Sequence, residues 1–157
     1  MTRISSCLIA VAVLAASGAF AGESGTQPTV TAPAVDVLDT PHFLAAATDA
    51  ASRGDKDAAI QLFQSAIIYA PNNPMPYTRL GNFYAGSGQM DMASQYYNSA
   101  LNVQPAYAPA LQGLAMVALA SGNRAGAEAQ HNILLRACGP NCPETAEVGK
   151  ALSESRP

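Results

Sequence analysis

Between residues 40 and 141, hydrophobic and small side chains recur at spacings of three and four, which places them on one face of an α-helix. In the clearest stretch, two such faces are separated by the break Gly86-Ser87-Gly88. The first face carries Tyr77, Leu80, Gly81 and Tyr84, and the second carries Ala93, Tyr97, Ala100 and Leu101. Extended along the chain, the pattern predicts six helices, over residues 41–52, 55–70, 74–86, 89–103, 108–120 and 123–138.

The pattern also repeats with a fixed period. Glycines and alanines recur 34 residues apart, and one pair of prolines keeps the same spacing. The positions are Gly54, Gly88 and Gly122, then Ala59, Ala93 and Ala127, and finally Pro71 and Pro105. A period of this length predicts stacked helical units, each too small to bury its hydrophobic face alone. The product of such a stack is a surface, which favours binding over catalysis.

Residues 74–107 resemble the tetratricopeptide repeat (TPR), a helix-turn-helix unit of 34 residues. They carry its aromatic-x2-Leu-Gly-x2-Tyr, Ala-x3-aromatic and closing proline elements. The resemblance implies an all-α, right-handed α-solenoid of three units, over residues 40–73, 74–107 and 108–141. Residues 142–157 would form a capping helix and tail, because the last repeat must cover its apolar face.

The outer units depart from the pattern. Ala46 stands where the repeat has leucine, and His131 stands where the earlier units have Phe63 and Tyr97. We interpret His131 as a substitute packing residue. The last closing proline has moved to Pro140.

The N-terminus predicts export. Arg3 precedes an apolar run, and Ala19-Phe20-Ala21 fits the small-residue site of signal peptidase. Residues 1–21 are therefore expected to be a signal peptide cleaved after Ala21, which places the protein in the periplasm or outside the cell. The run is too short to span a bilayer comfortably, so no stable membrane span is expected after cleavage. Residues 22–39, rich in Thr, Pro, Gly and Ser, are expected to be a flexible linker.

Charge and motifs exclude several functions. The net charge of the whole chain is −3, and no basic stripe is present, which argues against nucleic acid and acidic membranes as partners. No nucleophile elbow, phosphate loop or zinc-protease motif occurs. We therefore expect no enzyme activity, no catalytic residue, no cofactor and no metal.

Cys138 and Cys142 are the two thiols that remain after cleavage. An oxidising compartment favours a disulfide between them. A continuous helix would hold the two residues too far apart, but Gly139-Pro140 breaks the helix between them. Two alternatives stay open: a redox-active dithiol, and a metal site that includes His131.

The first helix of each TPR unit lines a concave groove. By alignment, the groove would present Leu44, Thr48, Thr78, Arg79, Asn82, Gln112 and Met116. The subgroup of the family that grips acidic C-termini uses several Lys, Arg and Asn side chains there, and this chain keeps only Arg79 and Asn82. A nearly neutral groove fits an extended or helical peptide better.

The resemblance implies an exported adaptor that scaffolds an envelope assembly such as a pilus, a secretion system or cytochrome maturation. The alternatives are a thiol-redox or metal-handling protein based on Cys138 and Cys142, and a structural subunit that self-associates.

Overall fold

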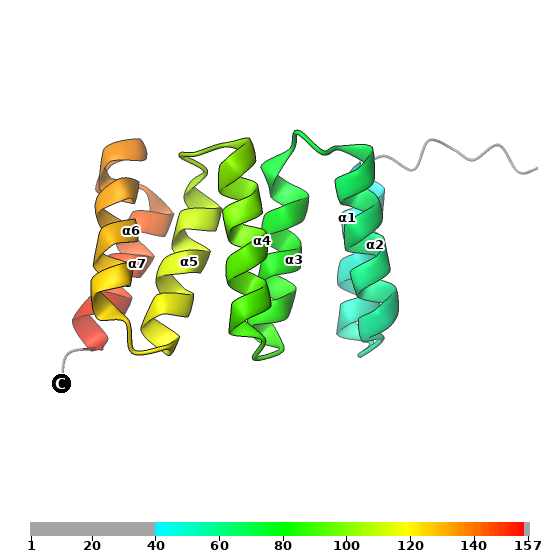
Figure 1. Ribbon diagram of the computed structural model, residues 1–157, viewed down its shortest axis with the longest axis horizontal. Helices are drawn as coiled ribbons and strands as arrows, with labels where there is room; N and C mark the ends of the chain where they lie inside the picture. The colour runs from blue at the N-terminus through cyan, green and yellow to red at the C-terminus, as the bar shows by residue number, and fades with distance from the viewer. Residues whose placement is uncertain (1–39, 156–157) are drawn as a thin grey trace, which may run out of the picture. The chain divides into compact units, whose positions relative to one another are not determined.

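The computed structural model describes residues 40–155, and the predicted signal peptide (1–21) and linker (22–39) lie outside the described residues. Within this range the regular structure is entirely α-helical (Figure 1). The seven helices are α1 (Thr40–Ser52), α2 (Lys56–Tyr69), α3 (Pro74–Gly86), α4 (Met90–Val103), α5 (Ala108–Ala120), α6 (Arg124–Ala137) and α7 (Pro143–Glu154). The predicted fold class is confirmed: a solenoid of helix-turn-helix units.

The helices pack in pairs, and the pairs stack into two layers. Each unit joins two consecutive helices, α1 with α2, α3 with α4, and α5 with α6. The odd-numbered helices also contact one another in the order α1, α3, α5, α7, whereas in residues 40–155 the even-numbered helices do not. The odd-numbered layer is therefore the more closely spaced one and lies on the inside of the curve, which makes it the concave face.

The 34-residue glycine period marks the turn inside each unit. Gly54, Gly88 and Gly122 have φ values of 80°, 77° and 73°, a left-handed conformation that is cheap only for glycine. In each turn, the next residue donates its N–H back to a carbonyl of the preceding helix, as from Asn123 to Ala118 at 2.8 Å. The recurring glycine thus lets the chain reverse direction while a carbonyl at the end of the preceding helix keeps a hydrogen-bond partner.

Helix boundaries lie within one residue of those predicted, because capping is local. Asp55 and Asn123 precede α2 and α6, and their side chains accept hydrogen bonds from the backbone N–H groups of Ala58 and Gly126, at 3.1 and 2.9 Å. The predicted ranges 55–70 and 123–138 had counted these caps as helix.

The interior consists mainly of alanine, leucine and tyrosine, in two clusters of buried residues. The larger cluster joins the first two units and reaches α5 of the third through Ala110 and Val117. The smaller one closes the C-terminal end, and α7 supplies two of its members; it comprises Leu111, Ala115, Ala127, Leu134, Val148 and Leu152. The predicted capping helix therefore forms and covers the last unit. The imidazole of His131 faces α7 at Gly149, in keeping with a packing role.

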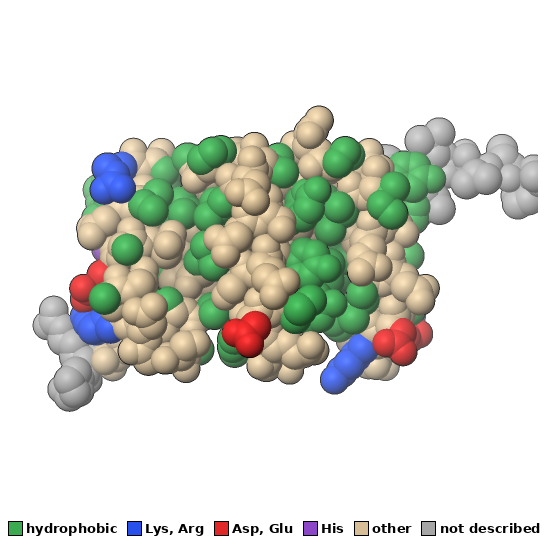
Figure 2. Space-filling model, in the orientation of Figure 1, with side chains coloured by type: hydrophobic (Ala, Val, Ile, Leu, Met, Phe, Trp, Pro, Cys, Tyr) green, Lys and Arg blue, Asp and Glu red, His purple; other side chains and the backbone are tan. Residues whose placement is uncertain are grey.

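The face in Figure 2 carries hydrophobic side chains between α2 and α4, and its charged side chains lie near the edges. Ile68 and Tyr69, at the end of α2, are 76% and 59% exposed.

No helix within residues 40–155 is long and apolar enough to cross a bilayer.

Candidate functional site: a groove on the inner helices

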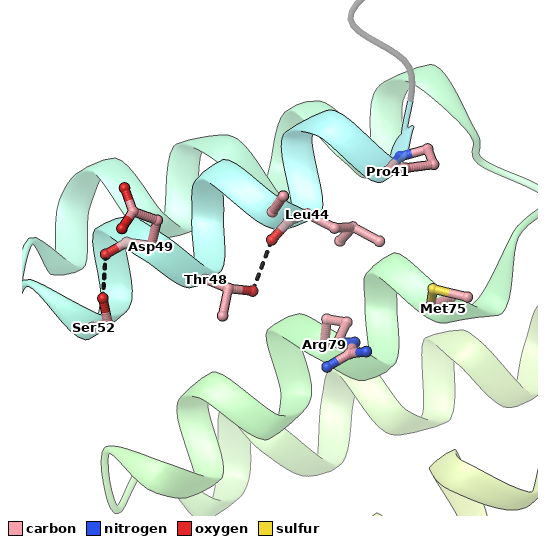
Figure 3. Close-up of a pocket in the computed structure, with 8 residues that line it drawn as sticks. Pro41, Leu44, Thr48, Asp49, Ser52, Met75 and Arg79 are labelled. Atoms are coloured by element: carbon pink, nitrogen blue, oxygen red, sulfur yellow. Dashed lines mark hydrogen bonds between the residues drawn. The ribbon is translucent and has the colours of Figure 1, made fainter.

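An open cleft lies between α1 and α3 on the concave side (Figure 3). Its volume is about 590 Å³, within the range of small-ligand pockets and large enough for peptide side chains. Its walls are Pro41, Leu44, Ala45, Thr48, Asp49 and Ser52 from α1, with Met75 and Arg79 from α3. Met75 is 41% exposed and offers a flexible apolar contact.

Hydrogen bonds within α1 determine which polar groups the α1 side of the cleft offers to a ligand. The Thr48 hydroxyl donates to the carbonyl oxygen of Leu44 at 2.8 Å, and the Ser52 hydroxyl donates to that of Asp49 at 2.7 Å (Figure 3). Both protons are therefore used inside the helix. The carboxylate of Asp49 pairs with the exposed Arg53, which offsets its charge. The α1 side of the cleft therefore offers apolar contacts and only weak hydrogen-bond acceptors.

A second pocket, of about 160 Å³, lies between α3 and α5. It is lined by Met75, Thr78, Arg79, Asn82, Tyr107 and Pro109. Because Met75 and Arg79 line both pockets, the two form one groove that runs from α1 across α3 to α5. We call this surface the α1–α3–α5 groove.

Polar donors gather at the α5 end of the α1–α3–α5 groove. Burial raises the pKa of the Tyr107 phenol above its ordinary value; Arg79 opposes the shift and Glu144 adds to it. The phenol is thus a neutral hydrogen-bond donor at physiological pH. Asn82 accepts a hydrogen bond at Oδ1 from the Tyr97 hydroxyl of α4, at 2.8 Å. Arg79 is the one cation in the wall of the groove among the described residues.

Five of the seven predicted groove residues line the α1–α3–α5 groove: Leu44, Thr48, Thr78, Arg79 and Asn82. Leu44 and Thr78 are only 9% and 3% exposed, and the Thr78 hydroxyl donates to the carbonyl of Pro74 at 3.1 Å, so they form its floor. Ligand binding by these residues remains a prediction.

Gln112 and Met116 lie on α5 outside both pocket walls. Gln112 donates a hydrogen bond to the Glu147 carboxylate, because α7 packs beside α5 as a fourth inner helix. Met116 is 45% exposed. Their place in a binding site also remains a prediction.

Several groove residues, Met75 and Tyr107 among them, are absent from the set predicted from the sequence. Pro41, Met75 and Pro109 are 34 residues apart, so the period could have identified them as one row. Tyr97 was predicted as a packing residue, and the sequence has no local pattern that indicates the hydrogen bond from its hydroxyl to the groove residue Asn82.

Cys138 and Cys142 form a disulfide, with their Cα atoms 5.7 Å apart. Cys138 ends α6 and Cys142 precedes α7, so the bond joins the last repeat helix to the cap. A Glu144 carboxylate oxygen lies 2.9 Å from Sγ of Cys142, and the Thr145 hydroxyl lies 3.4 Å from Sγ of Cys138.

The metal-ligand group that the structure brings together near these cysteines is Cys138, Cys142 and Glu144, with ligand atoms within 4.8 Å of one another. His131, a ligand in the metal-site alternative, is not part of it. While the disulfide is closed, both sulfurs are committed to each other.

Comparison with known proteins gives one family and many similar folds. The sequence model of the family described as "Cilia and flagella-associated protein 70 middle TPR-like domain" matches residues 43–153. Among curated proteins, no sequence matches the chain.

Three solved structures illustrate the likeness. The first TPR of Spaghetti (RPAP3), bound to the HSP90 peptide SRMEEVD, has 19% identity and a TM-score of 0.64, covering 77% of this chain and 95% of that one. The Sgt2 TPR domain from Aspergillus fumigatus has 22% identity and a TM-score of 0.62, with coverage of 74% and 76%. The Yersinia enterocolitica type III secretion chaperone SycD, in complex with a peptide of the translocator YopD, has 20% identity and a TM-score of 0.61, with coverage of 73% and 87%.

Proposed function

Because the chain belongs to the family of the cilia and flagella-associated protein 70 middle TPR-like domain, we propose that it is an adaptor whose α1–α3–α5 groove binds a peptide segment of a partner protein. The observation that carries the proposal is the continuity of two pockets through Met75 and Arg79. Two proteins of similar fold are described in complex with peptides, the RPAP3 domain and SycD, which supports a peptide ligand.

The wall of the groove indicates what kind of peptide fits. Arg79 is its one cation among the described residues, and Asp49 is offset by Arg53. A strongly acidic tail would find too few positive partners. A peptide with apolar side chains for the α1–α3 cleft and main-chain carbonyls for the donors near α5 fits better.

A binding experiment tests the groove. Twelve-residue peptides are selected on the wild-type protein from a random library, and their affinity is measured by fluorescence anisotropy. We expect the double variant Arg79→Ala/Asn82→Ala to bind them at least about tenfold more weakly, because it removes two exposed donors, one of them charged. Arg136→Ala is the matched control, since Arg136 is an exposed arginine in the last turn of α6, away from the groove.

The same assay separates the adaptor from the alternatives. An adaptor keeps its affinity in Cys138→Ser/Cys142→Ser, whereas a thiol-redox or metal-handling protein depends on those sulfurs. A self-associating subunit would fill its own groove, and its sedimentation coefficient would rise with concentration. Unchanged peptide affinity in Arg79→Ala/Asn82→Ala would contradict the proposal that the peptide binds in the α1–α3–α5 groove.

The cellular setting has two lines of support that differ. The sequence of residues 1–21 supports export, and an exported adaptor would serve an envelope assembly such as a pilus, a secretion system or cytochrome maturation. The name of the family supports an assembly of cilia or flagella instead. We retain export as the proposal for this chain because the signal pattern lies in its own residues.

Processing distinguishes these settings. When the full chain is produced in a bacterium, we expect it in the periplasmic fraction with Gly22 as its first residue, read by N-terminal sequencing. The matched control, Ala19→Arg/Ala21→Arg, removes the small residues that signal peptidase requires and should prevent cleavage. A full-length wild-type chain in the cytoplasm would rule out the envelope adaptor and leave the ciliary or flagellar setting.

A further inference from the structure

Tyr97 reaches from the outer layer of the solenoid to the concave groove. It belongs to α4, and its side chain is only 2% exposed. Its hydroxyl nevertheless lies 2.8 Å from Oδ1 of Asn82, an exposed residue of α3 that lines the pocket between α3 and α5. A residue of the packing layer therefore contacts a residue of the candidate binding surface.

Two glycines hold the Tyr97 ring in place. A Cβ atom built on Gly81 of α3 would lie 2.7 Å from Cε1 of the ring, and one on Gly113 of α5 would come closer still. Cβ atoms do not approach other heavy atoms below about 3.0 Å. The ring thus occupies a slot between α3 and α5 that exists because both residues lack a side chain, and the slot fixes the position of the hydroxyl.

The hydrogen bond has a direction. Burial raises the pKa of the Tyr97 phenol, so it keeps its proton at neutral pH and donates to Oδ1 of Asn82. This bond distinguishes the two ends of the amide, because the oxygen is the acceptor and the NH2 group can only donate. Among residues 40–155, the Asn82 NH2 group has no hydrogen-bond partner, and Asn82 is an exposed residue of the groove wall.

We propose that Tyr97 is a positioning residue: it fixes the Asn82 amide with its NH2 group available to the groove, so that this point selects a carbonyl oxygen of the bound peptide. The inference rests on the proposed peptide-binding function and adds to it the kind of group that is recognised. Tyr97 itself need not touch the ligand.

The first experiment needs no ligand. In a nitrogen-15 correlation spectrum of the wild-type protein, the side-chain NH2 signals of Asn82 are expected to be well resolved and to shift on Tyr97→Phe, which removes only the hydroxyl. Tyr77→Phe is the matched control, because the Tyr77 hydroxyl donates elsewhere, to the carbonyl oxygen of Pro71 at 3.1 Å. Unchanged Asn82 signals in Tyr97→Phe would overturn the positioning role.

The second experiment measures binding of the library-selected peptides to a set of variants. Tyr97→Phe is expected to weaken binding about fivefold, and Tyr77→Phe to leave it unchanged. In an Asn82→Ala background, Tyr97→Phe should have no further effect, because Tyr97 acts through Asn82. An equal loss in both backgrounds would show that Tyr97 acts only through the fold.

Asn82→Asp tests the direction of the hydrogen bond. Aspartate can still accept from Tyr97, but it has no NH2 group to offer the peptide. We expect it to bind as weakly as Asn82→Ala, and wild-type affinity would overturn the inference. If no peptide is selected on the wild-type protein, the proposed function fails, while the spectra still decide whether Tyr97 orients Asn82.

Discussion

Leu134→Ala is expected to lower the free energy of unfolding by about 2–5 kcal/mol, the range for removing a large side chain from a close-packed core. Leu134 is 0% exposed and lies in the C-terminal cluster with Leu111, Val148 and Leu152. This cluster joins the last unit to α7, so a cavity there weakens both the unit and its cap. Urea denaturation followed by circular dichroism measures the change.

The neighbouring residue provides the control. Leu135 has the same chemistry on the same helix, but it is 38% exposed. Leu135→Ala should cost about 1 kcal/mol, because more than a third of Leu135 already faces solvent and its truncation leaves no enclosed cavity. Similar losses in the two variants would contradict the location of the C-terminal core and the capping role of α7.

Gly113→Ala is expected to destabilise the protein by about 1–3 kcal/mol, the typical cost of overpacking. The direction of this change is informative, because replacing glycine by alanine inside a helix normally raises the free energy of unfolding by about 1 kcal/mol. Here the added methyl group would collide with the Tyr97 ring. That ring is buried between α3 and α5 and cannot move aside without opening their interface.

Gly86→Ala is the matched control for this prediction. Gly86 also lies in a helix, at the end of α3, and a Cβ atom there meets nothing within 4 Å. Its stability should be unchanged or slightly raised. The loss of stability caused by Gly113→Ala should also be smaller in a Tyr97→Leu background, since leucine does not fill the space between α3 and α5 that the tyrosine ring occupies. A melting temperature of Gly113→Ala at or above that of the wild type would show that the slot is not tight.

The helices were predictable because the interactions that define them are local. Asn73 shows this clearly: it accepts a hydrogen bond from the backbone N–H of Met75 at 3.0 Å, directly before Pro74 opens α3. An acceptor followed by proline is readable in the sequence without knowledge of any other helix. The sequence also favoured the disulfide over its alternatives, because Gly139-Pro140 breaks the helix between the two cysteines, and Gly139 does turn the chain there with a φ of 85°.

The groove was only partly predictable, because its composition depends on how helices from different units meet. The repeat identified Arg79 and Asn82 as residues of an inner helix, but it could not show that Arg79 joins two pockets. Nor could it show that Gln112 is engaged by Glu147, which lies 35 residues further along the chain. Such pairs depend on side-chain reach across an interface, for which the sequence has no short-range signal.

The sequence by itself determined the repeat and the helices with their glycine turns, since these follow from hydrogen bonding and periodicity within a few residues. For Cys138 and Cys142 it favoured a disulfide but left two alternatives open. The tertiary structure alone decided that Tyr97 passes between Gly81 and Gly113 to Asn82, because that contact requires α3, α4 and α5 to be packed together. Its geometry is a property of three helix surfaces at once, and no single segment of the chain encodes it.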